Sequence, residues 1–523
     1  MELAATPPAA APAEAGPRNR RYSFVEKIVL AVLLVTVADW VFFFQRSGST
    51  LGVYAALLLT VTLIAHPAIL RSRSALGAAA AALLFATALF DDPSVLGAAL
   101  FWAAATMAAL LPRAGFDDGW RWTKRLAVQF VLAVALPFRD WRRLRAARRR
   151  RGPIGLTRRL PVLWLPLAGS LLFLALFANA NPLIGDAFAR IDVLVVVGGF
   201  SFSRLAFWTA LTMLVWSFLR PTRFRLPPAA AGEVDFSLPG VSSASVTLSL
   251  LAFNIIFALQ NGLDLAFLWS RAGLPEGITL AEYAHRGAYP LIATALLAAL
   301  FVLVILRPGS PLAESPVIRR LVYLWIGQNV MLVASTILRT LDYVDAYSLT
   351  ILRISAMLWM TLVAVGLVLI CYRIWARKSG PWLINANLAA ALLMLAGCSF
   401  VDLGAAAASW NVRHARDVGG RGVALDVCYL QRLGSSALLP LVEIESRPLA
   451  PQLRERVSWA RNLAMDRLET QQRDWHGWTF RGHRRLGEAR RLVAERRLPR
   501  VHADRRPCGG FTTEAALTAP AVR

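Results

Sequence analysis

Apolar residues in this chain form long continuous runs, separated by charged stretches. Each run has about 18–25 residues, enough for a helix to cross a hydrocarbon core of about 30 Å. Continuous runs favour helices over a barrel, whose strands alternate apolar and polar residues. The pattern predicts an all-α, polytopic transmembrane helix bundle of about eleven spans, at residues 25–44, 51–70, 75–90, 94–111, 160–178, 203–219, 244–268, 287–306, 317–338, 351–374 and 382–404.

The runs also divide the chain into regions. No small-residue cleavage site follows the first run, so we interpret it as a retained span rather than a signal peptide. The two ends of the chain are typical of disordered tails. The predicted regions are a tail at 1–24, helices 1–4 at 25–111, a basic cytoplasmic loop at 112–159, helices 5–11 at 160–404, a small helical extension at 405–497 and a tail at 498–523.

The basic loop contains a short apolar run, LAVQFVLAVALPF, from Leu126 to Phe138. Thirteen residues are too few to span a bilayer comfortably. The flanking sequences WRWTKR and RDWRRLRAARRRR predict an interfacial helix, anchored by Trp120, Trp122 and Trp141, with arginines toward anionic lipid. If the run spans instead, every later helix inverts; a re-entrant or partner-binding hairpin is a further alternative.

Basic residues in the short loops predict the orientation. Cytoplasmic loops are enriched in Lys and Arg, and the loops on one side hold far more of them than those on the other, which offer Arg46 and Arg271. The N-terminus is therefore expected in the cytoplasm, and an odd number of spans puts the basic C-terminal region outside. Long hydrophilic regions translocate largely regardless of charge. The residues on the basic side are Arg18, Arg20, Arg21, Lys27, Arg71, Arg73, Arg220, Arg223, Arg225, Arg307, Arg319, Arg320, Arg373, Arg377 and Lys378.

Composition supports a membrane protein. Of 523 residues, 57% are hydrophobic and 17% charged, against roughly 45–50% and about 25% in soluble chains. The net charge of +25 is compatible with loops that meet the lipid bilayer and its anionic lipids. We do not expect nucleic-acid binding, because no recognition module accompanies the charge.

Cofactor and metal motifs are not found. The sequence has no GxxxxGK[ST], GxGxxG, HExxH or GxSxG pattern, so no cofactor, metal or catalytic residue is assigned. Cys371, Cys398, Cys428 and Cys508 show no CxxC spacing. This spacing predicts neither a disulfide framework nor a zinc site.

Polar residues form stripes on two of the predicted helices. Asn254, Gln260, Asn261 and Asp264 fall within an arc of about 120° at 100° per residue. On the helix at 317–338, Gln328, Ser335, Arg339 and Asp342 step by seven, four and three residues, which also stacks them. An ionisable group at mid-membrane costs about 2.5–3.5 kcal/mol, so it normally faces protein or water.

These polar residues share a depth near the outer ends of their helices. Two interpretations remain open: structural ion pairs, of Arg339 or Arg353 with Asp342 or Asp264, or an outward-facing polar cavity that binds a small solute, a lipid headgroup or a polymer end. The nearly bare inner halves count against simple alternating access. The candidate cluster is Asn181, Asn254, Gln260, Asn261, Asp264, Arg286, Gln328, Arg339, Asp342, Tyr343 and Arg353.

Several segments in order carry a family resemblance: FANANP from Phe177, FALQNGLD from Phe257, EYAHRG from Glu282, RTLDYVDAYSLTILR from Arg339, and then WNV and ALDVCYL. Over roughly residues 160–440 the chain resembles a bacterial multi-pass family, domain of unknown function 4173, related to 4153. His285 and Pro290 depart from that pattern, where Arg and Glu are expected. The resemblance implies a bacterial cytoplasmic membrane protein and implies no reaction.

Two classes of function follow. The first is a non-enzymatic envelope component that binds or moves a solute or lipid, or that senses or scaffolds. The alternative is a membrane-embedded envelope enzyme, such as a transferase acting on a lipid-linked substrate, with Asp264, Asp342 or Asp345 as acid or base. An enzyme would need a carboxylate with a perturbed pKa in a pocket large enough for two substrates.

Overall fold

The computed structural model describes residues 24–150, 201–222, 242–269 and 315–499, with the isolated positions 170, 297 and 301. All regular structure in these ranges is helical, as the sequence predicted. Apart from those isolated positions, the predicted spans at 160–178 and 287–306 lie outside the described residues, as do Asn181, Arg286 and nearly all of the two predicted tails.

The first group of helices is tightly packed around small residues. Serines cap two of these helices: Ser72 accepts from Ala75 N and Ser94 from Gly97 N. Gly52 is required where two helices cross, because a Cβ there would lie 2.3 Å from the backbone nitrogen of Phe90. The elements are α1 (Phe24–Phe42), α2 (Thr50–Ala65), η1 (Pro67–Arg71), α3 (Arg73–Asp91), α4 (Val95–Ala114) and α9 (Phe202–Leu219).

A second group follows in the chain and packs around Trp325. Its first helix ends in one π-helical turn, and its second is longer than predicted by more than two turns, so the helix carries Arg339, Asp342 and Tyr343. The elements are α10 (Ser243–Asp264), η2 (Leu265–Trp269), α13 (Pro316–Tyr347), α14 (Ile351–Trp375) and α15 (Gly380–Phe400).

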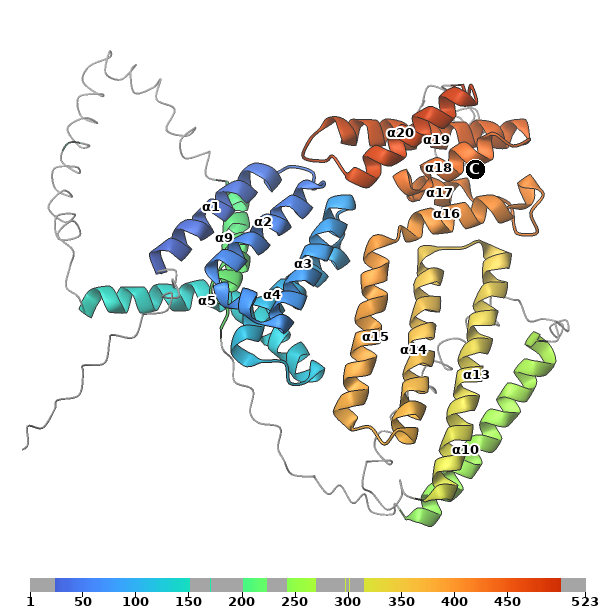
Figure 1. The fold of residues 1–523 in the computed structure, drawn as a ribbon. Coiled ribbons are helices and arrows are strands. Elements are labelled where there is room, and N and C mark those ends of the chain that lie inside the picture. Colours follow the sequence, from blue (N-terminus) through green and yellow to red (C-terminus); the bar gives the residue numbers. More distant parts are fainter. Residues whose placement is uncertain are drawn as a thin grey trace, which may run out of the picture.

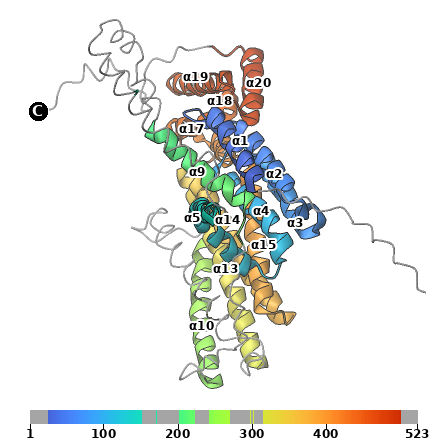
Figure 2. The same cartoon turned by 90° about the vertical axis from the view of Figure 1, so that its left-hand side faces the viewer.

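Helix directions alternate in the way the predicted spans require. In Figures 1 and 2, α1, α3, α10, α13 and α15 run toward the C-terminal helices, and α2, α4, α9 and α14 run away from them. α4 and α9 share a direction, as do α10 and α13, and the sequence between the members of each pair includes residues outside the described ranges. The predicted spans at 160–178 and 287–306 fall in those two intervals.

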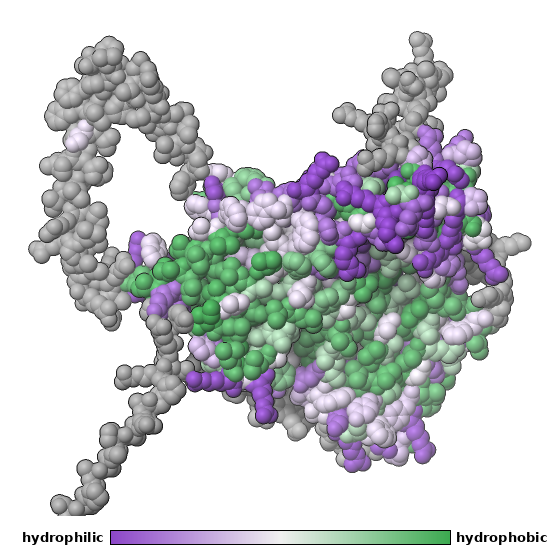
Figure 3. Space-filling model, turned by 45° about the horizontal axis from the view of Figure 1, so that its top comes forward, coloured by the Kyte–Doolittle hydropathy of each residue, from purple (hydrophilic) through white to green (hydrophobic). Residues whose placement is uncertain are grey.

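Seven of the described helices are long and apolar enough to cross a membrane: α3, α4, α9, α10, α13, α14 and α15. The first two predicted spans are not among them, because α1 carries Glu26, Lys27 and Asp39 and α2 has 16 residues. The face in Figure 3 carries a band of hydrophobic residues beside a hydrophilic C-terminal region. The chain is an integral membrane protein by these criteria, and the count of eleven stays a prediction.

The basic loop forms one long helix, α5 (Gly119–Arg150), which lies crosswise to the α13–α15 group in Figure 1. Trp120 and Trp141 are half exposed, as expected of interfacial anchors. The prediction for Trp122 is wrong: it is 2% exposed and stacks on Phe116. Two residues along a helix are about 200° apart, so Trp120 and Trp122 take opposite faces.

The C-terminal region is helical and has its own core. Its elements surround buried aliphatic residues, among them Leu441, Ile444 and Val457. Glu445 and Arg461 form a buried ion pair, with Arg461 Nε 2.5 Å from Glu445 Oε2. The elements are α16 (Leu403–His414), η3 (Arg416–Val418), α17 (Val427–Arg432), η4 (Gly434–Ala437), α18 (Leu438–Glu445), α19 (Pro451–Arg473) and α20 (Phe480–Glu495).

One cysteine differs from the expectation. Cys371 and Cys398 are free thiols in α14 and α15. Cys428, in α17, is disulfide-bonded, although the cysteine spacing predicted no disulfide framework. The remaining cysteine of the sequence is Cys508, outside the described residues. Spacing could not predict the bond, because no local cysteine motif marks it.

The loop between α19 and α20 docks the C-terminal region on the α1–α2 loop. Ser49 N donates to the Trp478 carbonyl at 2.7 Å, and Phe480 N donates to Ser49 Oγ at 3.0 Å. Arg481 pairs with Asp91 and Asp92, at 2.6 and 3.2 Å. Backbone and charge contacts thus tie together segments roughly 400 residues apart.

Two carboxyl groups at this junction have shifted pKa values. Burial raises the pKa of Asp92, an effect that Arg481 opposes. Burial would also raise the pKa of Asp402, but hydrogen bonds from Ala405 N and Arg485 outweigh it and lower this pKa overall. The contribution of Asp402 to stability is therefore present above its unfolded pKa and is lost as the pH falls through the lowered folded value.

Gly48→Ala is expected to loosen this docking. A Cβ at Gly48 would lie 2.3 Å from the Trp478 carbonyl oxygen and 2.5 Å from that of His476, so the backbone must move, at about 1–3 kcal/mol. Hydrogen exchange of residues 474–482 in the full-length protein should accelerate. Gly487→Ala is the matched control, because nothing lies within 4 Å of its Cβ position. Equal exchange in the two variants would contradict the docking.

Candidate functional site

The polar stripes of α10 and α13 face each other, which is compatible with both interpretations of the sequence. The two helices are side by side and parallel in Figures 1 and 2. Asn254 lies deepest: its Nδ2 donates to the Leu250 carbonyl at 2.7 Å and to the Leu321 carbonyl of α13 at 3.1 Å. This bond joins a side chain of α10 to the backbone of α13, so it fixes the position of one helix along the axis of the other.

Amide side chains continue this contact toward the C-terminal side. Gln328 Nε2 donates to Asn254 Oδ1 at 3.2 Å, and Asn261 Nδ2 donates to the Gln328 carbonyl at 3.1 Å. Asn254 and Asn261 are each 6% exposed. Buried amides between apolar helices stabilise the pair because each would otherwise be unsatisfied in hydrocarbon.

A buried ion pair completes the row. Arg339 Nη2 donates to Asp264 Oδ1, with the two side chains 6% and 1% exposed. Gln260 Nε2 donates to the same oxygen at 3.0 Å. Each charge therefore has its counter-charge inside the protein, as the cost of a lone intramembrane charge requires. We call the row of Asn254, Gln260, Asn261, Asp264, Gln328 and Arg339 the polar ladder.

The polar ladder retains unused hydrogen-bond acceptors. Asn261 Oδ1, Asp264 Oδ2 and Gln328 Oε1 are buried and have no hydrogen-bond partner in the structure, and the same holds for Asn329 Oδ1 beside them. Buried polar atoms in native proteins are nearly always paired with protein or water. The three oxygens that belong to the ladder thus retain hydrogen-bonding capacity for N–H or O–H donors.

Among the described residues, no group of three or more His, Cys, Asp and Glu side chains could hold a metal ion. The ladder itself contains one carboxylate, and Arg339 already neutralises it. A divalent cation would need several oxygen ligands with more negative charge. The ladder therefore offers neutral amide oxygens and one neutralised carboxylate as acceptors.

The predicted residues beyond the ladder organise the α13–α14 connection. Arg353 stacks on Tyr343, with its guanidinium carbon 4.3 Å from the ring centroid. Its Nη1 also donates to the carbonyl of Tyr347, at 2.7 Å, and to that of Ser348. Asp342 lies on the same stretch of α13. The family-like stretch RTLDYVDAYSLTILR thus comprises the end of α13, the connecting loop at 348–350 and the start of α14.

C-terminal residues hold this loop in place. Asn411 accepts from Leu349 N at 2.6 Å and donates to the Leu349 carbonyl at 2.9 Å. Ile351 N donates to the Tyr429 hydroxyl at 3.0 Å. These contacts assign structural roles to WNV and ALDVCYL, which resemblance alone could not do. Asn329 was missed by sequence reasoning, although it adjoins Gln328.

Ser348→Gly is expected to stabilise the protein by about 1 kcal/mol. Ser348 has φ +69° and ψ +161°, a region that glycine adopts without strain and other residues at about 1–3 kcal/mol. Greater freedom of glycine in the unfolded chain offsets part of the gain. The measurement is reversible unfolding in mixed micelles. Ser355→Gly, inside α14, is the control and should destabilise by up to about 1 kcal/mol; a loss at Ser348 as well would contradict the strain.

A family model, domain of unknown function (DUF4153), matches residues 77–444. The match covers more than half of the chain. The chain belongs to the DUF4153 family. No curated protein and no solved structure matches it.

The DUF4153 match includes the polar ladder, the α13–α14 loop and the C-terminal helices up to α18. It begins within α3, earlier than the resemblance noted in the sequence, so the first group of helices belongs partly to the family region. The match is to the related family, and the assignment to domain of unknown function 4173 stays a prediction. DUF4153 proteins carry no assigned reaction by that description, so function has to be argued from the site.

Proposed function

We propose that this protein is a non-enzymatic component of the bacterial cell envelope that binds a donor-rich solute or lipid headgroup at the polar ladder. It would lie in the cytoplasmic membrane, with its N-terminus inside and its C-terminal helices outside. It would also belong to the related family, domain of unknown function 4173. The single observation that carries the proposal is the set of buried, unused acceptors around the Asp264–Arg339 pair.

Two observations support the orientation. The short loops on the side of the α1 N-terminus hold most of the loop Lys and Arg, which favours the cytoplasm. The disulfide of Cys428 lies on the opposite side, and disulfides persist in oxidising compartments outside the cytoplasm. Asp264 ends α10, and Arg339 lies in the C-terminal third of α13, so the ladder would face outward.

The state of Asp264 favours binding over catalysis. Its Oδ1 already accepts from both Arg339 and Gln260. A general acid or base needs access to a substrate proton. The alternative, a transferase acting on a lipid-linked substrate, would have to use Asp342 or Asp345 of α13 instead. Asp345 is exposed beside a cavity of about 20 Å³, far below the size of two substrates.

A path from the ladder to the outer helices favours a sensing role. Arg339 belongs to α13, whose C-terminal end continues into the loop that Asn411 and Tyr429 hold. A ligand that changes the packing of α10 against α13 would shift this end of α13. The C-terminal helices would then report occupancy to a partner in the envelope.

A reporter fusion tests the orientation. Fusion after Ser446, at the end of α18, places the reporter in the C-terminal helices. A reporter active outside the cytoplasm should give signal, and one active in the cytoplasm should not. Signal from the cytoplasmic reporter alone would overturn the orientation and with it an outward-facing ladder.

Thermal unfolding of the purified protein tests the site. Glucose, N-acetylglucosamine, glycerol and ethanolamine supply O–H or N–H donors and serve as probes. A probe at 100 times its Kd should raise the free energy of unfolding by about 2.7 kcal/mol. Gln328→Met removes one acceptor and should abolish the shift, whereas Gln129→Met, buried elsewhere in the bundle, should retain it. An unchanged shift in Gln328→Met would contradict binding at the ladder.

A further inference from the structure

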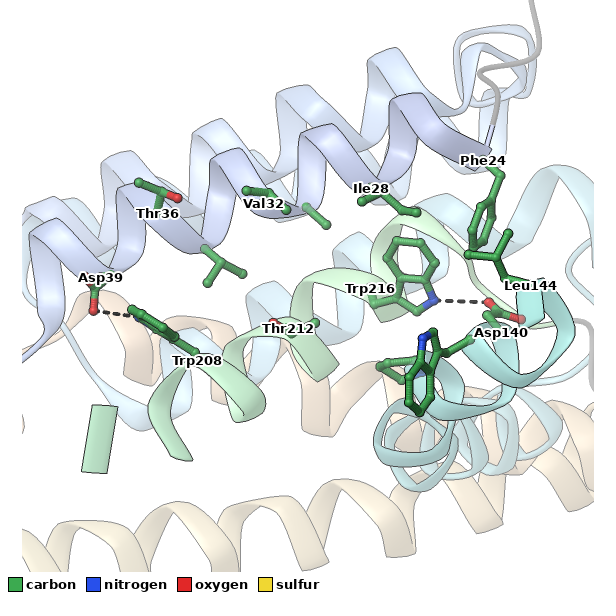
Figure 4. Close-up of a pocket in the computed structure, with 14 residues that line it drawn as sticks. Phe24, Ile28, Val32, Thr36, Asp39, Asp140, Leu144, Trp208, Thr212 and Trp216 are labelled. Atoms are coloured by element: carbon green, nitrogen blue, oxygen red, sulfur yellow. Dashed lines mark hydrogen bonds between the residues drawn. The ribbon is translucent and has the colours of Figure 1, made fainter. Parts of the chain in front are cut away.

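A groove lies between α1, α5 and α9 (Figure 4), in a different group of helices from α10 and α13 (Figure 1). Ile28, Val32 and Thr36 of α1 face Trp208, Thr212 and Trp216 of α9 across it, and Leu144 of α5 closes one end. Its volume of about 450 Å³ falls within the range of roughly 300–1,000 Å³ typical of ligand pockets. Val32 is 59% exposed, so the groove opens on the outer surface of the bundle.

The shape and lining of the groove suit a lipid tail. It runs along α1 from Phe24 to Asp39, a distance of about 22 Å at 1.5 Å per residue. One leaflet of the hydrocarbon core is about 15 Å thick. An acyl chain therefore fits along the groove, and the aliphatic and aromatic walls offer it the same environment as neighbouring lipid.

The charges at the two ends differ, which indicates where a headgroup would lie. At one end, Asp39 is neutralised by Arg204, at 2.5 Å. At the other end, Arg139 and Arg220 share the one carboxylate of Asp140, at 3.7 and 3.2 Å. Arg145 stacks there on Trp141, with its guanidinium carbon 3.6 Å from the ring centroid.

Three guanidinium groups beside one carboxylate leave an excess of positive charge at the α5 end. Arg145 is exposed and sits directly over an aromatic residue that lines the groove. Arginine binds phosphate in a bidentate geometry. We propose that this groove binds one anionic phospholipid, with an acyl chain between α1 and α9 and the phosphate against Arg145, Arg139 and Arg220.

Native mass spectrometry of the full-length protein in detergent tests the proposal. The probes are phosphatidylglycerol and phosphatidylcholine with identical acyl chains. The wild type should retain one phosphatidylglycerol in preference to phosphatidylcholine. Arg145→Gln should weaken retention roughly fivefold, the effect of one basic residue near a lipid surface. Lys124→Gln is the matched control, because Lys124 lies over Trp120 at the other end of α5 and should leave retention unchanged.

Filling the groove gives an independent variant. Thr212→Trp should displace the lipid, whereas Thr209→Trp, on the exposed face of the same helix, should not. Equal retention of the two lipids, or equal retention by the two tryptophan variants, would overturn the proposal. So would efficient cross-linking in membranes between Thr212→Cys and cysteines introduced at positions 165–175, because the chain's own predicted span would then occupy the groove.

Discussion

Arg339→Ala is expected to lower the free energy of unfolding by about 3–5 kcal/mol, because it leaves Asp264 as an uncompensated buried charge. Asp264 is 1% exposed, so water cannot replace the lost partner without opening α10 from α13. Asp264→Ala should cost a similar amount for the reciprocal reason. Unfolding in mixed micelles, followed by circular dichroism, gives the free energies.

The double variant separates the ion pair from general damage. Asp264→Ala combined with Arg339→Ala should cost less than the sum of the single changes, since neither charge is then left alone. Arg320→Ala is the matched control: it is exposed on the same helix and should change stability by less than about 0.5 kcal/mol. Additive costs would mean that the pair does not hold the two helices together.

Arg461→Ala should be as damaging within the C-terminal region, at about 3–5 kcal/mol. Arg461 is 0% exposed and binds both oxygens of Glu445, at 2.5 and 3.1 Å, and the Pro499 carbonyl at 2.7 Å. Ser458 donates to the same carboxylate at 2.6 Å. Hydrogen exchange of α18 and α19 in the full-length protein should accelerate strongly.

Two further variants define this result. Arg467→Ala, exposed on the same helix, should leave exchange unchanged. Arg461→Met with Glu445→Leu should recover most of the loss, because apolar residues of similar size often replace a buried ion pair without cost. If Arg461→Ala and Arg467→Ala behave alike, the buried pair is not what holds α18 on α19.

The two buried pairs have different consequences for function. Asp264 and Arg339 lie beside unused acceptors, so their variants should also alter any probe-induced shift. Glu445 and Arg461 lie inside the C-terminal core, where the same loss of stability should leave binding at the ladder intact. Comparing the probe-induced shifts in variants of the two pairs thus separates an effect on the binding site from a general loss of stability.

The sequence by itself determined the fold class, the membrane location of the apolar helices and the residues of the polar ladder. Long apolar runs leave few alternatives to membrane helices, and polar residues at helical spacing within them must face protein. Which helix faces pack together decides three other features. These are the burial of Trp122 on α5, the length of α13, and the pairing of Arg339 with Asp264 rather than Asp342. Local spacing does not fix those choices.

Only the tertiary structure decided the contacts between distant segments. Arg481 forms ion pairs with Asp91 and Asp92, almost 400 residues away in the chain. Asn411 forms hydrogen bonds with the backbone of Leu349. No local sequence pattern around Arg481 or Asn411 indicates these partners. The groove between α1, α5 and α9 is likewise formed by three helices whose individual patterns predict only membrane or interfacial segments. Periodicity defines the face a helix buries; packing of whole helices defines what that face meets.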